Sequence, residues 1–216
     1  MGLPTPLTDP AAIVATDAST VINLNATGCA RELIQAIPNK VVVLDVVASE
    51  LHEGRRRGRR DADLLGELVA ARVVELVELD DSSGIHFERL VVGAAAMTLD
   101  DGEAATIAYA YSHRAVAIID ERKASRLCAE MFPSLRIGST VDILAHPSVE
   151  QRMGKRMLAE AVFNALQIGR MRVFPRNVEW VVKLIGQERA AGCVSLPNSV
   201  RKAGRSETRT GRRSAG

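Results

Sequence analysis

The chain has 216 residues, of which 47% are hydrophobic, so we expect one globular domain with a real core and no second full domain. Aromatic residues make up only 3%, so an aromatic platform that stacks bases is a poor candidate, and nucleic-acid recognition would have to use charge and shape. The formal net charge is +2. No apolar stretch approaches the roughly 18 residues of a membrane span, and residues 1–10 lack the pattern of a signal peptide. We therefore expect a cytoplasmic protein without a membrane partner.

Three short apolar runs predict buried strands. They cover residues 12–15, 41–44 and 115–119, and each is apolar without alternation, which is typical of a parallel sheet covered on both faces. Stretches of helical period, such as 29–37 and 102–111, lie between them, and this order implies right-handed crossovers. The predicted fold class is therefore α/β, with a central parallel sheet between helices.

Four acidic residues, here called the acidic quartet, follow these strands or begin a helix. Asp17 and Asp120 come almost directly after the first and third runs, Glu50 lies a few residues past the second, and Glu103 follows Gly102 at a predicted helix start. Because ligands bind beyond the carboxyl ends of parallel strands, we expect the quartet to reach one crevice. Clustered carboxylates raise one another's pKa values, and a divalent cation such as Mg²⁺ relieves this repulsion. A metal held there would polarise a phosphodiester and activate a bound water.

Basic residues are concentrated in two places. Residues 55–60 contain five arginines in six positions, and residues 201–216 carry six basic residues against one acidic residue. The first group begins five residues after Glu50, so it can flank the acidic crevice and contact phosphates, although a solvated loop is the alternative. For the second group we favour a loose basic tail without fixed structure. The arginines of the first group are Arg55, Arg56, Arg57, Arg59 and Arg60.

The acidic quartet lies in four sequence blocks that follow one another in a recognisable order. The blocks are Asp-Ala-Ser-Thr-Val-Ile-Asn-Leu from Asp17, Val-Val-Ala-Ser-Glu-Leu from Val46, Gly-Glu-Ala-Ala-Thr-Ile-Ala from Gly102 and Ile-Asp-Glu-Arg-Lys from Ile119. Together they resemble the PIN-domain ribonucleases, in particular the bacterial and archaeal toxin-like branch whose third block reads Gly-Glu-Ala. The resemblance extends from about residue 13 to residue 146.

The resemblance implies a PIN-like three-layer α/β/α fold, metal-dependent endonucleolytic cleavage of RNA, and Mg²⁺ or Mn²⁺ as the ion. It makes Asp17, Glu50, Glu103 and Asp120 the catalytic and metal-binding acids. Ser19 matches a hydroxyl that orients Asp17 or a metal-bound water. Arg122 would contact the scissile phosphate, and an ion pair with a neighbouring acid is an equally good account. Many relatives are toxins, so the resemblance also implies a homodimer and an antitoxin partner.

The residues of the quartet are also compatible with ordinary structural roles and with two different functions. A helix cap would account for Asp17 and Asp120, and a helix-dipole contact would account for Glu103. At the level of function, one alternative is a nucleic-acid or protein-binding module that keeps the fold and cuts nothing. Another is a phosphatase or receiver protein with an aspartate as phosphoryl acceptor. Serine-hydrolase, dinucleotide and phosphate-loop motifs are absent, and the three cysteines are spaced as reduced thiols rather than as a disulfide frame.

The chain divides into three predicted parts. They are a PIN-like nuclease domain at 1–146, a helical extension at 147–200 and the basic tail at 201–216. We expect helices in the extension around 153–168 and 175–185, either docked on the core or free to bind a partner.

Four acidic neighbours of the quartet are ambiguous. Asp142 follows Gly-Ser-Thr-Val and is either an auxiliary acid or a helix-terminal residue, and we favour the second. Asp45, Asp100 and Asp101 could contribute to the site. We prefer Glu103 to Asp101 because Gly102 permits a close approach and the two alanines after Glu103 permit tight helix packing.

Overall fold

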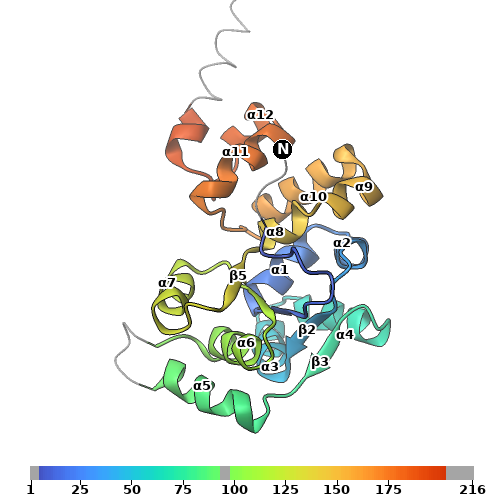
Figure 1. Ribbon diagram of the computed structural model, residues 1–216. Helices are drawn as coiled ribbons and strands as arrows, with labels where there is room; N and C mark the ends of the chain where they lie inside the picture. Colours follow the sequence, from blue (N-terminus) through green and yellow to red (C-terminus); the bar gives the residue numbers. More distant parts are fainter. Residues whose placement is uncertain (1–4, 93–97, 203–216) are drawn as a thin grey trace, which may run out of the picture.

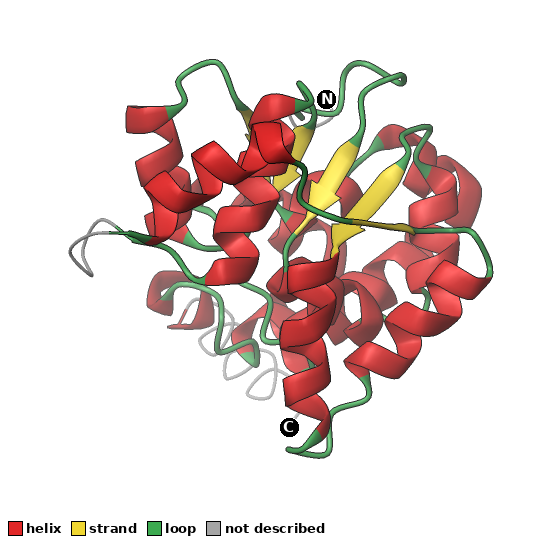
Figure 2. Ribbon diagram, turned by 90° about the horizontal axis from the view of Figure 1, so that it is seen from below, coloured by secondary structure: helices red, strands yellow, loops and turns green. Residues whose placement is uncertain are grey.

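The computed structural model describes residues 5–92 and 98–202. Five parallel strands form one sheet in the order β3-β2-β1-β4-β5. Helices cover both faces of this sheet (Figure 2), so the predicted three-layer α/β/α fold with a central parallel sheet is confirmed. The strands are β1 (Val14–Thr16), β2 (Val41–Leu44), β3 (Glu75–Val77), β4 (Val116–Ile118) and β5 (Arg136–Gly138).

The helices fill the connections between the strands and then continue beyond the last one (Figure 1). α6 packs against β1, β2 and β4, while α1 contacts α2, α4 and α10. The helices are α1 (Ala18–Ala26), α2 (Ala30–Ala36), α3 (Asp45–Arg55), α4 (Asp61–Ala70), α5 (Asp81–Val91), α6 (Asp101–Ser112), α7 (Arg122–Met131), α8 (Thr140–Leu144), α9 (Pro147–Met153), α10 (Lys155–Gln167), the 3₁₀ helix η1 (Pro175–Asn177), α11 (Val178–Ile185) and α12 (Gln187–Ala191).

The apolar runs of the sequence correspond to the three central strands. The prediction for 41–44 matches β2, and those for 12–15 and 115–119 overlap β1 and β4. All residues of these three strands are buried. The apolar pattern did not predict β3 and β5, which lie at the two edges of the sheet, because their residues are partly exposed and form no continuous apolar run.

The helices predicted after residue 146 are present. The segment predicted at 153–168 is interrupted at Gly154, whose φ of 79° ends α9 before α10 begins. α10 contacts α1, and its residues Leu158, Val162 and Leu166 belong to the hydrophobic core. α11 and α12 lie at the opposite end of the molecule from α5 (Figure 1). The division of the chain at residue 146 stays a prediction.

Three further expectations concern the tail, the membrane and the cysteines. Residues 201 and 202 are helical, and the rest of the predicted tail, 203–216, lies outside the described residues. Within the residues that are described, none of the helices has the length and apolar character needed to cross a bilayer. Cys29, Cys128 and Cys193 are free thiols, as predicted.

Candidate active site

Asp17 links the end of β1 to the start of α1. It is the N-cap of α1: its Oδ1 accepts a hydrogen bond from the backbone N–H of Thr20 at 2.8 Å. Ser19 donates its hydroxyl to Oδ2 at 2.8 Å, which is the orienting contact expected for this serine. Thr20 in turn donates to the carbonyl of Ile118 at 3.1 Å and so ties α1 to β4. Asp17 is only 2% exposed. Its carboxylate caps α1 and is held in a fixed position beyond the carboxyl end of the central strand β1.

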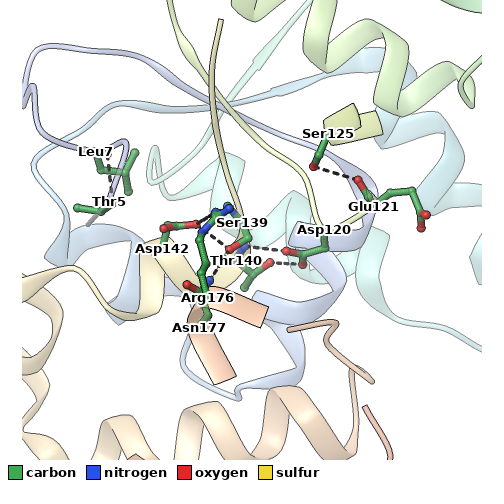
Figure 3. Close-up of polar contacts among 10 residues, drawn as sticks. All are labelled: Thr5, Leu7, Asp120, Glu121, Ser125, Ser139, Thr140, Asp142, Arg176 and Asn177. Atoms are coloured by element: carbon green, nitrogen blue, oxygen red, sulfur yellow. Dashed lines mark hydrogen bonds and ion pairs between the residues drawn. The ribbon is translucent and has the colours of Figure 1, made fainter. Parts of the chain in front are cut away.

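Asp120 lies just beyond β4 and is held by three donors. Its Oδ1 accepts from the backbone N–H of Thr140 at 2.9 Å, and its Oδ2 accepts from the Thr140 hydroxyl at 2.6 Å and the Asn23 amide at 2.7 Å. Figure 3 shows the Thr140 contacts. Asp120 is 3% exposed. A buried carboxylate with this many donors is fixed in one orientation, and Asn23 and Thr140 are the residues that fix it.

Glu50 and Glu103 approach the same region from α3 and α6. Glu103 is in the first turn of α6, directly after Gly102. A Cβ atom at residue 102 would collide with Oε2 of Glu50, so Gly102 lets the Glu50 side chain lie directly against the start of α6. Glu50 itself is exposed on α3.

Burial first, and neighbouring carboxylates second, raise the pKa values of all four quartet members. Burial, followed by the charges of Asp17, Asp100 and Glu50, raises the pKa of Glu103 to about 7. Burial and the charge of Asp17 raise the pKa of Asp120 to about 6. Burial also raises the pKa of Asp17. Glu50 is exposed as a residue, but partial desolvation of its carboxylate, followed by the charges of Asp100, Glu53 and Asp101, raises its pKa as well. The site therefore favours protons or another cation, as the clustering of acids predicted.

A pocket of about 230 Å³ opens beside these acids. Glu103, Asp120 and Ser19 line it, whereas Asp17 and Glu50 are not among the described residues that do. No group of three or more His, Cys, Asp or Glu residues in 5–92 and 98–202 is arranged closely enough to form a ready-made metal shell. The structure thus brings two quartet members into one pocket and the other two into electrostatic range. The pocket is lined by Ser19, Ile22, Asn23, Arg59, Glu103, Asp120, Glu121, Gly169, Arg170 and Arg172.

Of the six predicted phosphate-binding arginines, Arg59 alone is among the described residues that line the pocket. Arg55 forms an ion pair with Asp63 at 2.5 Å. Arg56, Arg57, Arg60 and Arg122 are exposed. The expectation that the whole 55–60 run flanks the acids is therefore supported for Arg59 alone.

Several residues of the pocket were not found from the sequence. Arg170 and Arg172 reach it from the segment between α10 and η1, and Asn23 and Thr140 support Asp120. The positive charge of Lys123 lowers the pKa of Glu103 and partly offsets the burial. Asn23 and Lys123 lie inside the first and fourth sequence blocks, but no local pattern marks the role of any of the five, because these roles come from contacts between segments separated in the chain.

Asp142 is a helix-terminal residue rather than an auxiliary acid, as its sequence context favoured. It is fully buried and forms a capping box at the start of α8, where Oδ2 accepts from the backbone N–H and the hydroxyl of Ser139 at 2.7 Å each. Arg176 adds an ion pair to the same oxygen at 3.2 Å, and Asn177 donates to the Ser139 hydroxyl at 3.3 Å (Figure 3). Asp142 therefore connects η1 to the segment that holds Asp120.

A protein-family model described as a PIN domain matches residues 13–187 of the chain. The chain belongs to the PIN-domain family. PIN domains are generally nucleases and typically use divalent metal ions. A search of curated proteins found no match to this PIN domain.

The residues of this PIN domain fit a hard divalent cation. Every candidate donor in the quartet is a carboxylate oxygen, and Mg²⁺ or Mn²⁺ prefers oxygen ligands. Magnesium usually takes one or two direct carboxylates and completes its shell with waters and substrate phosphate. Glu103 and Asp120 in the pocket, with Asp17 and Glu50 in electrostatic range of Glu103, suit this arrangement better than a closed all-protein cage.

The raised pKa of Glu103 predicts how the stability of the metal-free PIN domain depends on pH. An unfolded glutamate has a pKa of about 4.3, and folded Glu103 has a pKa of about 7. Between these pH values the folded state keeps a proton that the unfolded state releases. Protonated Glu103 therefore makes its full contribution to the free energy of unfolding below the unfolded pKa, and this contribution is lost as the pH rises through about 7. Glu103→Gln should therefore melt at a higher temperature than the wild type at about pH 8 and at the same temperature at about pH 4.

Thermal melts in chelator at both pH values measure this difference. The matched control is Glu67→Gln, because Glu67 is an exposed glutamate on α4. Added Mn²⁺ should raise the melting temperature of the wild type at the higher pH more than that of Glu103→Gln, since the cation replaces the proton. A variant that melts below the wild type at the higher pH would contradict the assignment of an electrostatic penalty to Glu103.

Proposed function

We propose that this PIN domain is a metal-dependent endoribonuclease that hydrolyses RNA phosphodiester bonds with Mg²⁺ or Mn²⁺. The observation that carries the proposal is the pocket in which Glu103 and Asp120 lie beside arginines, with Asp17 and Glu50 in electrostatic range. Acidic oxygens suit the metal, and arginines suit the phosphates that the metal must meet.

In this proposal each residue of the site has a stated task. Glu103 and Asp120 hold the cation directly, and Asp17 and Glu50 hold it directly or through water. The bound metal supplies the charge that polarises the phosphodiester and lowers the pKa of the attacking water. Ser19 fixes the carboxylate of Asp17. Asn23 and Thr140 fix that of Asp120, and such supporting contacts typically change metal affinity or activity by about 10- to 100-fold.

The test is cleavage of a mixed RNA pool by the full chain. We expect cleavage to 5′- and 3′-fragments with Mg²⁺ or Mn²⁺ and none with chelator. Intact RNA under all metal conditions would contradict the proposal. A time course on one defined RNA then separates internal cuts, which give two fragments at once, from the gradual shortening that an exonuclease produces.

A specific observation favours a second candidate, a binding module that keeps the fold and cuts nothing. Capping α1 and binding Ser19 give the buried Asp17 carboxylate a structural role that needs no metal, and no ready-made shell of three ligands exists in the described part of the chain. If this candidate is correct, Asp17→Asn leaves RNA binding intact in a protein that never cleaves. In the nuclease, the same substitution abolishes cleavage.

The finer biological role that we propose is that of a cytoplasmic toxin, acting as a homodimer and neutralised by an antitoxin protein. The support is the Gly-Glu-Ala block at Gly102 and its resemblance to the toxin-like branch. Growth arrest on expression, relieved by the product of an adjacent reading frame, tests the toxin role. Light scattering of the purified chain tests the homodimer, and a monomeric mass would contradict it.

A further inference from the structure

Two arginines reach the pocket from the connector between α10 and η1. Along this connector the side chains alternate: Met171 and Val173 are buried in the core, whereas Arg170 and Arg172 are exposed. Both arginines line the pocket. The buried residues on either side of Arg172 anchor the connector, so the two guanidinium groups are presented from a fixed backbone rather than from a loose loop.

The start of the connector packs closely against Asn23, the residue that donates a hydrogen bond to Asp120. A Cβ atom at Gly169 would lie 2.8 Å from Oδ1 of Asn23, the residue that donates to Asp120, and 2.8 Å from the carbonyl of Ala165. The backbone N–H of Met171 bonds to that same carbonyl at 3.0 Å. Arg170 has a φ of 54°, in the region that favours glycine. A non-glycine residue with this left-handed backbone conformation, Arg170, therefore lines the pocket.

A third arginine enters the pocket from a distant segment. Arg59 belongs to the turn between α3 and α4, more than 100 residues before the connector, and lines the same pocket. Arg172 pairs with Glu121, and both side chains are partly exposed. The pocket therefore has exposed cationic groups from two segments, while Asp120 is buried. Exposed guanidinium groups can bind the oxygens of neighbouring phosphates in two-point hydrogen bonds.

The shape and lining of the pocket define what such a rim would bind. A volume of about 230 Å³ admits about one nucleotide of a single strand, whereas a double helix could not enter it. None of the described residues that line it is aromatic, so bases would find no stacking platform there. Contacts made by arginines to phosphates carry no base information. The geometry thus favours a sequence-tolerant ligand.

We infer that Arg59, Arg170 and Arg172 form a phosphate-binding rim that holds the backbone of single-stranded RNA across the acidic pocket. The inference rests on the proposed function for the identity of the ligand, and it adds Arg170 and Arg172 as residues that bind the substrate. Neutralising an arginine that contacts a phosphate removes about 0.7 from the slope of log K against log salt concentration for a single strand. Each single rim variant should therefore lower the magnitude of the slope by about 0.7.

The experiment measures binding rather than cleavage. Fluorescence anisotropy with labelled single-stranded RNAs of about 10 nucleotides, in uridine-, cytidine- and adenosine-rich versions, gives affinity at several salt concentrations. All variants carry Glu103→Gln so that the RNA stays intact in Mg²⁺, and a gel verifies this. The test variants are Arg59→Ala, Arg172→Ala and Arg170→Gly. Glycine at 170 removes the guanidinium and accepts the positive φ, so the fold is preserved.

Arg31→Ala is the matched control, since Arg31 is an exposed arginine on α2 that does not line the pocket. We expect each rim variant to weaken binding of all three RNAs to a similar degree and to lower the salt slope, while Arg31→Ala changes neither. Rim variants that behave like Arg31→Ala, or a parent protein that binds none of the RNAs, would overturn the inference. So would a loss confined to one base type.

The two proposals fail in distinguishable ways. If the wild type cleaves RNA but the rim variants bind as tightly as the control, the nuclease stands and the rim is wrong. If the rim variants lose binding but the wild type cleaves nothing with any metal, the rim stands as an RNA-binding site and the nuclease is wrong.

Discussion

Glu103→Gln is expected to lower the rate of RNA cleavage by roughly 100- to 1,000-fold. A metal held by fewer charges provides several kcal/mol less stabilisation of the transition state, and each 1.36 kcal/mol corresponds to a factor of about ten in rate. Glu103 lines the pocket, and the positive charge of Lys123 acts on its carboxylate. Glutamine has nearly the same size and lacks the charge. The measurement is single-turnover cleavage of one defined RNA at saturating Mg²⁺.

Glu103→Gln should lower the cleavage rate and raise the thermal stability of the metal-free protein at the same time. The same substitution should raise the melting temperature of the metal-free protein at about pH 8, because it removes a carboxylate whose pKa is raised to about 7. A protein that is more stable and much less active cannot owe its inactivity to unfolding. Glu67→Gln, on the exposed face of α4, should change neither property. Full activity in Glu103→Gln would exclude Glu103 from the metal site.

Arg176→Ala is expected to lower the free energy of unfolding by about 2 kcal/mol, which corresponds to about 4–8 °C in melting temperature for a chain of this size. Arg176 supplies the positive charge beside Asp142, a fully buried carboxylate. Without it, Asp142 keeps its bonds to Ser139 but loses its counter-charge. The expected loss is below that of a fully buried pair, because the Arg176 side chain is itself 51% exposed. Chemical denaturation at neutral pH measures it.

An exposed ion pair provides the control for this change. Lys40 and Glu75 lie 2.7 Å apart with side chains 54% and 53% exposed, so Lys40→Ala should lower the free energy of unfolding by less than about 1 kcal/mol.

Arg176→Ala should also reduce the affinity for Mn²⁺, because Asp142 holds Ser139, and Thr140 beside Ser139 holds Asp120. Equal stability of the Arg176→Ala and Lys40→Ala proteins would show that the Asp142 contact is no more important than a surface pair.

The central part of the fold could be predicted because burial leaves a direct mark on the sequence. β1, β2 and β4 are covered on both faces, so their residues form unbroken apolar runs. β3 and β5 lie at the edges and include Glu75 and Arg136, whose side chains reach solvent. A strand of three residues with such a composition has no pattern that separates it from a loop.

The candidate site divides in the same way. The carboxylates after β1 and β4 could be placed from the sequence, since parallel strands deliver their following residues to one edge of the sheet. Of the arginines that line the pocket, only Arg59 could be placed in this way. Local charge density pointed to residues 55–60, of which Arg59 lines the pocket whereas Arg55 pairs with Asp63. Charge density describes how basic a segment is and does not define which side chains face a neighbour.

By itself, the sequence determined the α/β class, the three central strands, the PIN-domain family and the order of the acidic quartet, because each of these depends on local patterns of burial or on residues at fixed spacing. Only the tertiary structure decided that Arg170 and Arg172 lie at the pocket, that Asn23 and Thr140 hold Asp120, and that Asp142 joins α8 to Arg176. The physical reason is that these contacts depend on how α10 and η1 pack against α1 and α8, and packing between distant segments leaves no periodic signal along the chain.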